Sequence, residues 1–413
     1  MQPGVWESIK EVFSAIWWLI VPLALGFFLW EQWLSYIKRK FVIETKQVLL
    51  EIKIPREVQK TPKAMEQVFS AFRAMYSFGF NWKQKYIKGE VELWLSLEMV
   101  GTAQGIFFYI RTPESHRNLI ESAIFAQYPE VEIQKVDDYV EEIGMTLPNE
   151  AFDLWGAEFT LARDNPYPIK TYPMFEEKIE EAQLDPLSQI MEVMSRLQGG
   201  ERIMIQILVK PIGDELAKEG EKLRDKIADR KKPIPDPSTA PIGNFFKDLA
   251  TAPFKQPEVQ EKKKEERGNL LMLTPGERST LEAIEKKSGK LAFETLVRFV
   301  FVDDRKSFTR SHISAVMGAM HQFNTNDLNS FKPNKDTLTA IRKGFFKDQR
   351  TYLRKRKLWD KFKFRRFSPK GSYLNTEELA TIFHIPSFAV KAPLLRHVPS
   401  KKGEPPAGLP IEE

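Results

Sequence analysis

The sequence contains no cysteine and only five histidines among its 413 residues. The absence of cysteine excludes a disulfide framework and any metal site built from thiolates. His312 and His321 fall on one predicted helix, but their spacing of nine residues places them on opposite faces at about 100° per residue. That geometry does not suit a shared metal ion. We therefore expect no metal and no other cofactor.

Nucleotide-binding and catalytic motifs are also missing. The sequence has no G-x-x-x-x-G-K-[ST] loop, no G-x-G-x-x-G and no H-E-x-x-H. Ser288-Gly289-Lys290 contains a Gly-Lys pair without the upstream glycine, and it precedes a predicted strand instead of a helix. We therefore expect a protein that is not an enzyme.

The most prominent feature that is present is a run of 19 residues without formal charge, Val12 to Trp30. A helix of that length measures about 28 Å, enough to cross the hydrocarbon core of a bilayer. We predict a single transmembrane anchor within residues 1–40, because a cleaved signal peptide would have a positive leader and a small-residue cleavage site. Aromatic and basic residues typical of a membrane interface accompany the run: Trp17, Trp18, Trp30, Trp33, Tyr36, Lys38, Arg39 and Lys40. The three basic residues after the span predict that the N-terminus lies outside and the remaining chain in the cytoplasm.

The residues after the anchor follow a strand and helix order that occurs twice. Alternating strands and two amphipathic helices in 45–140 give the order β-α-β-β-α-β, which is that of the ferredoxin-like fold. The same order of patterns recurs in 157–340, with a strand or hairpin over 157–172, a helix capped by Ser307 and a short strand near Phe331. We therefore predict an α+β protein in which two ferredoxin-like units follow one transmembrane helix. An acidic linker, residues 141–156, would join the units.

A long insertion, residues 213–290, interrupts the second predicted unit. It opens and closes with charged helices, 214–230 and 275–287, around a stretch rich in proline, serine and lysine. Such a composition buries little apolar surface, so we expect this insertion to be flexible. Phe245-Phe246 and Phe254 form either a short docking motif or an incidental part of a solvated segment.

A basic and aromatic segment covers residues 341–370. Residues 342–370 hold thirteen Lys and Arg against two Asp, whereas 137–158 holds seven acidic residues and no basic one. Cations beside aromatic rings are typical of nucleic-acid surfaces and of segments that lie on anionic lipid. A third interpretation is a basic face that packs on an acidic part of this chain or of a partner. The candidate binding residues are Arg350, Arg354, Lys355, Arg356, Lys357, Trp359, Lys361, Lys363, Arg365 and Arg366.

The C-terminal segment, 371–413, carries a resemblance to a known family. Leu374-Asn-Thr-Glu-Glu-Leu-Ala-Thr-Ile-Phe-His-Ile-Pro-Ser387, followed by Val390-Lys-Ala-Pro393 and a proline-rich tail, resembles the segment ahead of the motor in bacterial type IV secretion and conjugation ATPases of the coupling-protein kind. The motor with its phosphate loop is absent from this sequence, so nucleotide hydrolysis is not carried over. We expect a partner-docking motif in Asn375, Glu377, Glu378, His384 and Pro386.

The resemblance implies a non-catalytic scaffold subunit that positions a separate ATPase at the cytoplasmic face of the bacterial inner membrane. A homo-oligomer is a further expected partner class. The alternative function is a membrane-tethered nucleic-acid-binding protein that acts without a motor.

Overall fold

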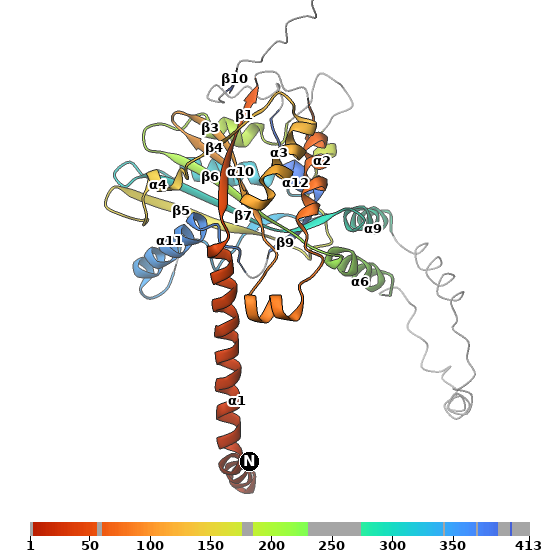
Figure 1. Ribbon diagram of the computed structural model, residues 1–413, viewed down its shortest axis with the longest axis vertical. Helices are drawn as coiled ribbons and strands as arrows, with labels where there is room; N and C mark the ends of the chain where they lie inside the picture. Colours follow the sequence, from red (N-terminus) through yellow and green to blue (C-terminus); the bar gives the residue numbers. More distant parts are fainter. Residues whose placement is uncertain are drawn as a thin grey trace, which may run out of the picture.

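The computed structural model describes residues 3–55, 60–175, 185–229, 274–341, 343–368, 371–386 and 397–398. A long helix, α1 (Pro3–Glu44), projects from a body in which helices pack on one large β-sheet (Figure 1). The middle of the predicted insertion, with Phe245-Phe246 and Phe254, and the tail from residue 399 lie outside the described residues.

The sheet is antiparallel between neighbouring strands, in the order β4–β1–β3–β2–β6–β7–β5–β8. The pairing of β2 with β6 makes the strands of both halves of the chain into one continuous sheet. A short strand, β9, pairs with β7, and β10 adds to β1 in parallel. The strands are β1 (Gln47–Pro55), β2 (Leu95–Thr102), β3 (Gly105–Pro113), β4 (Glu132–Val136), β5 (Phe152–Leu161), β6 (Arg202–Pro211), β7 (Ala292–Asp304), β8 (Phe331–Pro333), β9 (Ser372–Asn375) and β10 (His397–Val398).

The alternation of side chains along each strand gives the sheet two apolar faces, because successive residues point to opposite sides. The larger core lies under five helices: α2 (Pro62–Phe72), α3 (Arg117–Gln127), α5 (Ser188–Met194), α10 (Ser311–His321) and α12 (Thr376–Ile382). The smaller core on the other face lies under α4 (Val140–Ile143) and α11 (Lys347–Lys363). The charged helices α6 (Glu215–Asp229) and α9 (Pro275–Ser288) extend together beyond the sheet (Figure 1).

The mixed α and β content, the N-terminal apolar helix and the antiparallel sheet confirm the sequence-based prediction at this level. Two elements differ from the prediction. Strand β5 begins at Phe152, five residues before the predicted element over 157–172, because Phe152 and Leu154 face the smaller core, and it ends at Leu161, eleven residues before the predicted end. Ser307 does not cap α10: its hydroxyl donates to Asp303 in a turn, and the helix begins at Ser311.

Gly156 lets helix α11 lie directly on strand β5. A Cβ atom at this position would lie 2.5 Å from the carbonyl oxygen of Phe299 and 2.6 Å from Leu358 Cδ2. Neither the strand backbone nor the packed Leu358 side chain can move aside without a loss of stability. The absence of a side chain at one position therefore sets the distance between the sheet and α11.

We expect Gly156→Ala to lower the free energy of unfolding by about 1–3 kcal/mol, the usual cost of overpacking. Urea titration of the full chain in detergent, followed by tryptophan fluorescence, measures it. Gly318→Ala on α10 is the matched control, because no atom lies within 4 Å of the added Cβ; it should be neutral or gain up to about 1 kcal/mol. Equal effects of the two substitutions would contradict the proposed close contact.

Candidate functional site

Helix α1 leaves the folded body and is long and apolar enough, from Trp17 to Glu44, to span a membrane. Its mean hydropathy is 1.3 and only 6% of the apolar window is buried against the protein. The aromatic residues predicted for the membrane interface are all 47–62% exposed: Trp17, Trp18, Trp30, Trp33 and Tyr36. They are therefore available to lipid.

The segment between α2 and β2 lies beside the C-terminal part of α1. Tyr86 stacks on Trp30 with ring centroids 6.0 Å apart. Gly89 has a positive φ of 69°, and a Cβ there would lie 2.5 Å from the Ile37 backbone. This contact places residues 76–94, which we call the interfacial loop, at the level of the tryptophans that follow the apolar run.

The free side of the interfacial loop is apolar and aromatic. Phe78 is 87% exposed, Trp82 64% and Ile87 57%. Lysines at 83, 85 and 88 accompany them. Exposed rings with interspersed cations beside a candidate span are typical of a segment at a lipid interface. The sequence reasoning missed this loop, although its signal, Phe78-Gly-Phe-Asn-Trp82-Lys83, was present.

The basic segment forms helix α11, and its apolar side is part of the smaller core. Leu358, Trp359 and Phe362 are each at most 1% exposed. The indole of Trp359 stacks on Phe362 and donates to the carbonyl of Gly144, 3.3 Å away. Trp359, which we predicted at a phosphate-binding surface, is therefore a core residue and cannot stack on bases or reach lipid headgroups.

Four polar side chains lie in register across β5, β7, β6 and β2, and α11 packs on this row. They are Glu158, Arg298, Gln206 and Glu98. Arg298 donates to Glu158 Oε1 at 2.7 Å and to Gln206, whose amide donates to Glu98 Oε1 at 3.0 Å. The row also binds backbone: Arg298 donates to the carbonyls of residues 361 and 366, and Gln206 to that of residue 362.

Arg365 completes this network from the turn after α11. Its guanidinium lies 2.9 Å from Glu98 Oε1 and also binds Asp138. Burial by itself raises the pKa of Glu98, but the charge of Arg365, with hydrogen bonds from Arg365, Ser96 and Tyr139, lowers it to about 2. The pKa of Arg365 is raised well above its usual range by Glu98 despite its burial. Both groups therefore stay charged at neutral pH.

Several other cations predicted to bind phosphate are paired inside the chain. Lys355 lies 2.6 Å from Asp153, and Lys361 lies 3.2 Å from Glu158. Arg354 donates to the carbonyls of Lys335 and Leu338. These contacts match the interpretation of a basic face packed on an acidic part of the same chain. Five cations of the predicted set remain at the surface, exposed or partly so: Arg350, Arg356, Lys357, Lys363 and Arg366.

The predicted docking motif is buried in this structure. Asn375 caps α12: its side chain accepts from the backbone of Glu378, and the Glu378 carboxylate accepts from the backbone of Asn375. Glu378 also lies 3.0 Å from the buried Lys287 of α9. Glu377 binds Lys290 at 2.7 Å. These residues join α12 to the larger core and are not exposed to a partner.

The last two residues of that motif are buried too. His384 lies 2.9 Å from the carboxylate of Asp185 and 2.8 Å from the carbonyl of Ala380. Pro386 is also buried. The expected contacts with a partner are therefore replaced here by contacts within the chain.

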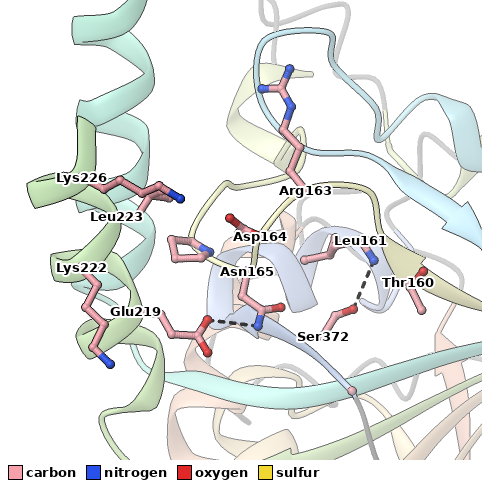
Figure 2. A pocket seen from close by; sticks show the side chains of 12 residues that line it. Thr160, Leu161, Arg163, Asp164, Asn165, Glu219, Lys222, Leu223, Lys226 and Ser372 are labelled. Carbon is pink, nitrogen blue, oxygen red and sulfur yellow. Dashed lines mark hydrogen bonds between the residues drawn. The ribbon is translucent and has the colours of Figure 1, made fainter. Parts of the chain in front are cut away.

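A cleft of about 560 Å³ lies between α6 and the loop after β5 (Figure 2). The amide of Asn165 donates to Glu219 of α6 at 3.1 Å, and the Ser372 hydroxyl accepts from the backbone of Leu161. The charge of the cleft is mixed, because acidic residues line it together with the basic residues Lys222, Lys226 and Arg163. Among the described residues, no group of three His, Asp or Glu side chains could hold a metal ion. We interpret the cleft as the joint between α6 and the sheet.

We expect Glu98→Gln to lower the free energy of unfolding at pH 7 by on the order of 3 kcal/mol, because it leaves a buried guanidinium without its main partner. The folded pKa of Glu98 lies below its usual value, so the stability it adds is present above about pH 4.5 and is lost as the pH falls towards 2. The difference between wild type and variant should shrink over that range. Denaturant titrations at several pH values measure it.

Glu192→Gln is the control for that substitution, since Glu192 and Arg196 form an exposed pair. It should change stability by at most about 0.5 kcal/mol at any pH. A Glu98→Gln variant that unfolds like this control would show that the network contributes nothing.

One known protein family matches the part of the chain that forms most of the sheet. The sequence model of this family matches residues 40–395, from the end of α1 to the segment before β10. None of the curated proteins matches the chain. The matched region covers most of the 413 residues, and the chain therefore belongs to the family described as Domain of unknown function (DUF8128).

Proposed function

We propose that this protein is a membrane-anchored, non-catalytic platform that holds a partner subunit at the cytoplasmic face of a bacterial inner membrane. The observation that carries the proposal is the junction between the apolar helix and the sheet. Only Thr45 and Lys46 separate the end of α1 from strand β1. A tether that served only for attachment would need no such short connection.

The junction is held on two sides. Thr45 closes α1, since its backbone amide and its hydroxyl both donate to the carbonyl of Phe41. The interfacial loop packs on the helix through Tyr86 and Gly89. Helix and sheet therefore move together, and the body keeps one orientation relative to the membrane if α1 spans it.

The finer architecture within the proposal is two ferredoxin-like units joined edge to edge. What supports this proposal is the strand order in each half of the sheet, β4–β1–β3–β2 and β8–β5–β7–β6, which is the order expected of one β-α-β-β-α-β unit. In this interpretation the pairing of β2 with β6 joins the units. The result is a broad, stiff surface, which suits a platform.

The partner we propose is a separate ATPase of an export or conjugation machine. The support is the resemblance of the segment from Leu374 to Ser387 to the membrane-proximal half of such ATPases. The first thirteen residues of that segment form β9, α12 and the turn after it, packed in the core. They therefore support a common fold more than a docking role. The exposed, charged sides of α6 and α9 are the surface that we propose for the partner (Figure 1).

The natural absence of cysteine makes a labelling test of membrane orientation simple. We expect Ser279→Cys, on the exposed surface of α9, to react with a membrane-impermeant maleimide only after the cells are permeabilised. Gln2→Cys should react in intact cells, because the N-terminus lies outside in the proposed orientation. Reaction of residue 279 in intact cells would rule out a cytoplasmic body.

A second experiment addresses the partner. A photoactivatable crosslinker attached to Glu221→Cys, an exposed residue of α6 that does not line the cleft, should yield in native membranes a product with a protein that carries a phosphate loop. Lys135→Cys on β4, exposed at the far side of the body, is the matched control and should give no such product. Products without a nucleotide-binding protein, or the same product at both positions, would refute the ATPase as partner.

A further inference from the structure

A second and larger cleft, of about 1480 Å³, lies between the C-terminal end of α1 and the sheet. Its walls come from the last two turns of α1, the interfacial loop, strands β2, β3 and β6, and the turn after α11. It thus lies where the candidate span meets the folded body. Residues 364–368 of the basic segment contribute to its walls, whereas the docking motif predicted from the sequence does not line it.

The cleft is positively charged. Eight Lys and Arg residues line it against four Glu. Some of the cations are paired: Lys210 contacts Glu294, and Arg365 binds Glu98 and Asp138. The other six have no ion pair in the described part of the chain: Lys38, Arg39, Lys46, Lys85, Arg111 and Arg366.

Arg111 is the distinctive cation of this set. It lies on β3, paired in register with Leu49 and Ser96, and its side chain is partly buried. In the described ranges its guanidinium makes no hydrogen bond and no ion pair, since Glu98 and Asp138 bind Arg365 instead. Burial, together with the like charge of Arg365, lowers the pKa of Arg111, and the nearby charges of Asp138 and Glu98 offset only part of this shift. An unpartnered, partly desolvated arginine is costly, and an anion would relieve that cost.

The neighbouring apolar surface determines the kind of anion. Val42 and Ile43 of α1 line the same cleft, as do Trp94 and Phe364. Lys38 and Arg39 lie about 12 Å further along the helix than Trp30, at 1.5 Å per residue. If the apolar run lies in the hydrocarbon core, their backbone is at the outer edge of the headgroup layer, and their long side chains can reach back to the phosphate groups. A cationic cleft with an apolar wall at that depth fits a molecule that has both a phosphate and an acyl chain.

We propose that this cleft binds the phosphate-bearing headgroup of an anionic phospholipid, with Arg111 contacting the phosphate from the sheet and Lys38 and Arg39 contacting it from α1. The inference rests on the proposed function only in that α1 must span the membrane. A lipid in this position bridges the helix and the sheet. It therefore stabilises the orientation of the platform and makes it dependent on anionic lipid.

The test uses the full chain, purified in a neutral detergent and titrated in a calorimeter with three probes. These are dihexanoyl phosphatidylglycerol, dihexanoyl phosphatidylcholine and inorganic phosphate. We expect saturable binding of the phosphatidylglycerol and at least tenfold weaker binding of the other two. Arg111→Gln should weaken binding of the phosphatidylglycerol at least tenfold. Lys357→Gln, which removes an exposed cation of α11 outside the cleft, should leave it unchanged.

Arg111→Gln removes a like charge near Arg365, so its thermal unfolding midpoint should not fall. If this variant fails to fold, the double variant Lys38→Gln and Arg39→Gln, on the surface of α1, replaces it in the test. This double variant should also bind the phosphatidylglycerol at least tenfold more weakly. Three results overturn the proposal: equal binding of the two lipids, inorganic phosphate that binds as tightly as the phosphatidylglycerol, or undiminished binding by the folded variants. A chain that stays in membranes after alkaline extraction but binds no phosphatidylglycerol overturns this inference alone and leaves the platform in place.

Discussion

The arrangement of this protein depends on a buried ionic network that joins four strands to one helix. Glu98 lies at its centre, because it binds Gln206 on the neighbouring strand and Arg365 after α11. Charges buried this deeply are costly unless every one is paired. The pairing requires α11 in one position, and Gly156 allows the helix to come close enough to reach it. The network thus turns a strongly basic segment into part of the core.

The consequence for function is that the unpaired positive charge of the folded protein is distributed differently from the positive charge along the sequence. Three cations of the basic run pair with acidic residues of the sheet: Lys355 with Asp153, Lys361 with Glu158 and Arg365 with Glu98. Six cations without ion pairs in the described part of the chain line the cleft at the end of α1, among them Arg111 from a strand far away in the sequence. Beside them the interfacial loop exposes Phe78 and Trp82. The surface around the apolar helix therefore has the composition that a membrane interface requires.

Much of the secondary structure could be predicted from the sequence, because strong local patterns produced it. The alternating residues Gln47–Pro55 form strand β1, and Thr61-Pro62, a typical helix start, begins α2. Predictions from local patterns were wrong or incomplete where contacts between distant segments determine the structure. Ser307 resembles a helix cap but binds Asp303 in a turn. Asn375 does cap α12, yet the surroundings that bury the whole helix come from residues such as Lys287 and Asp185, about 90 and 190 positions away.

The sequence by itself determined the apolar helix, the order of strands and helices, and the local charge of each segment, since these follow from neighbours along the chain. Only the tertiary structure decided that β2 pairs with β6, that α11 is held by Glu98 and Arg298, and that Arg111 is left beside a cleft. The physical reason is that a charge becomes structural or available for a ligand according to which partners the fold brings within hydrogen-bond distance. Which partners come within that distance depends on how distant segments pack together, and no single segment determines it.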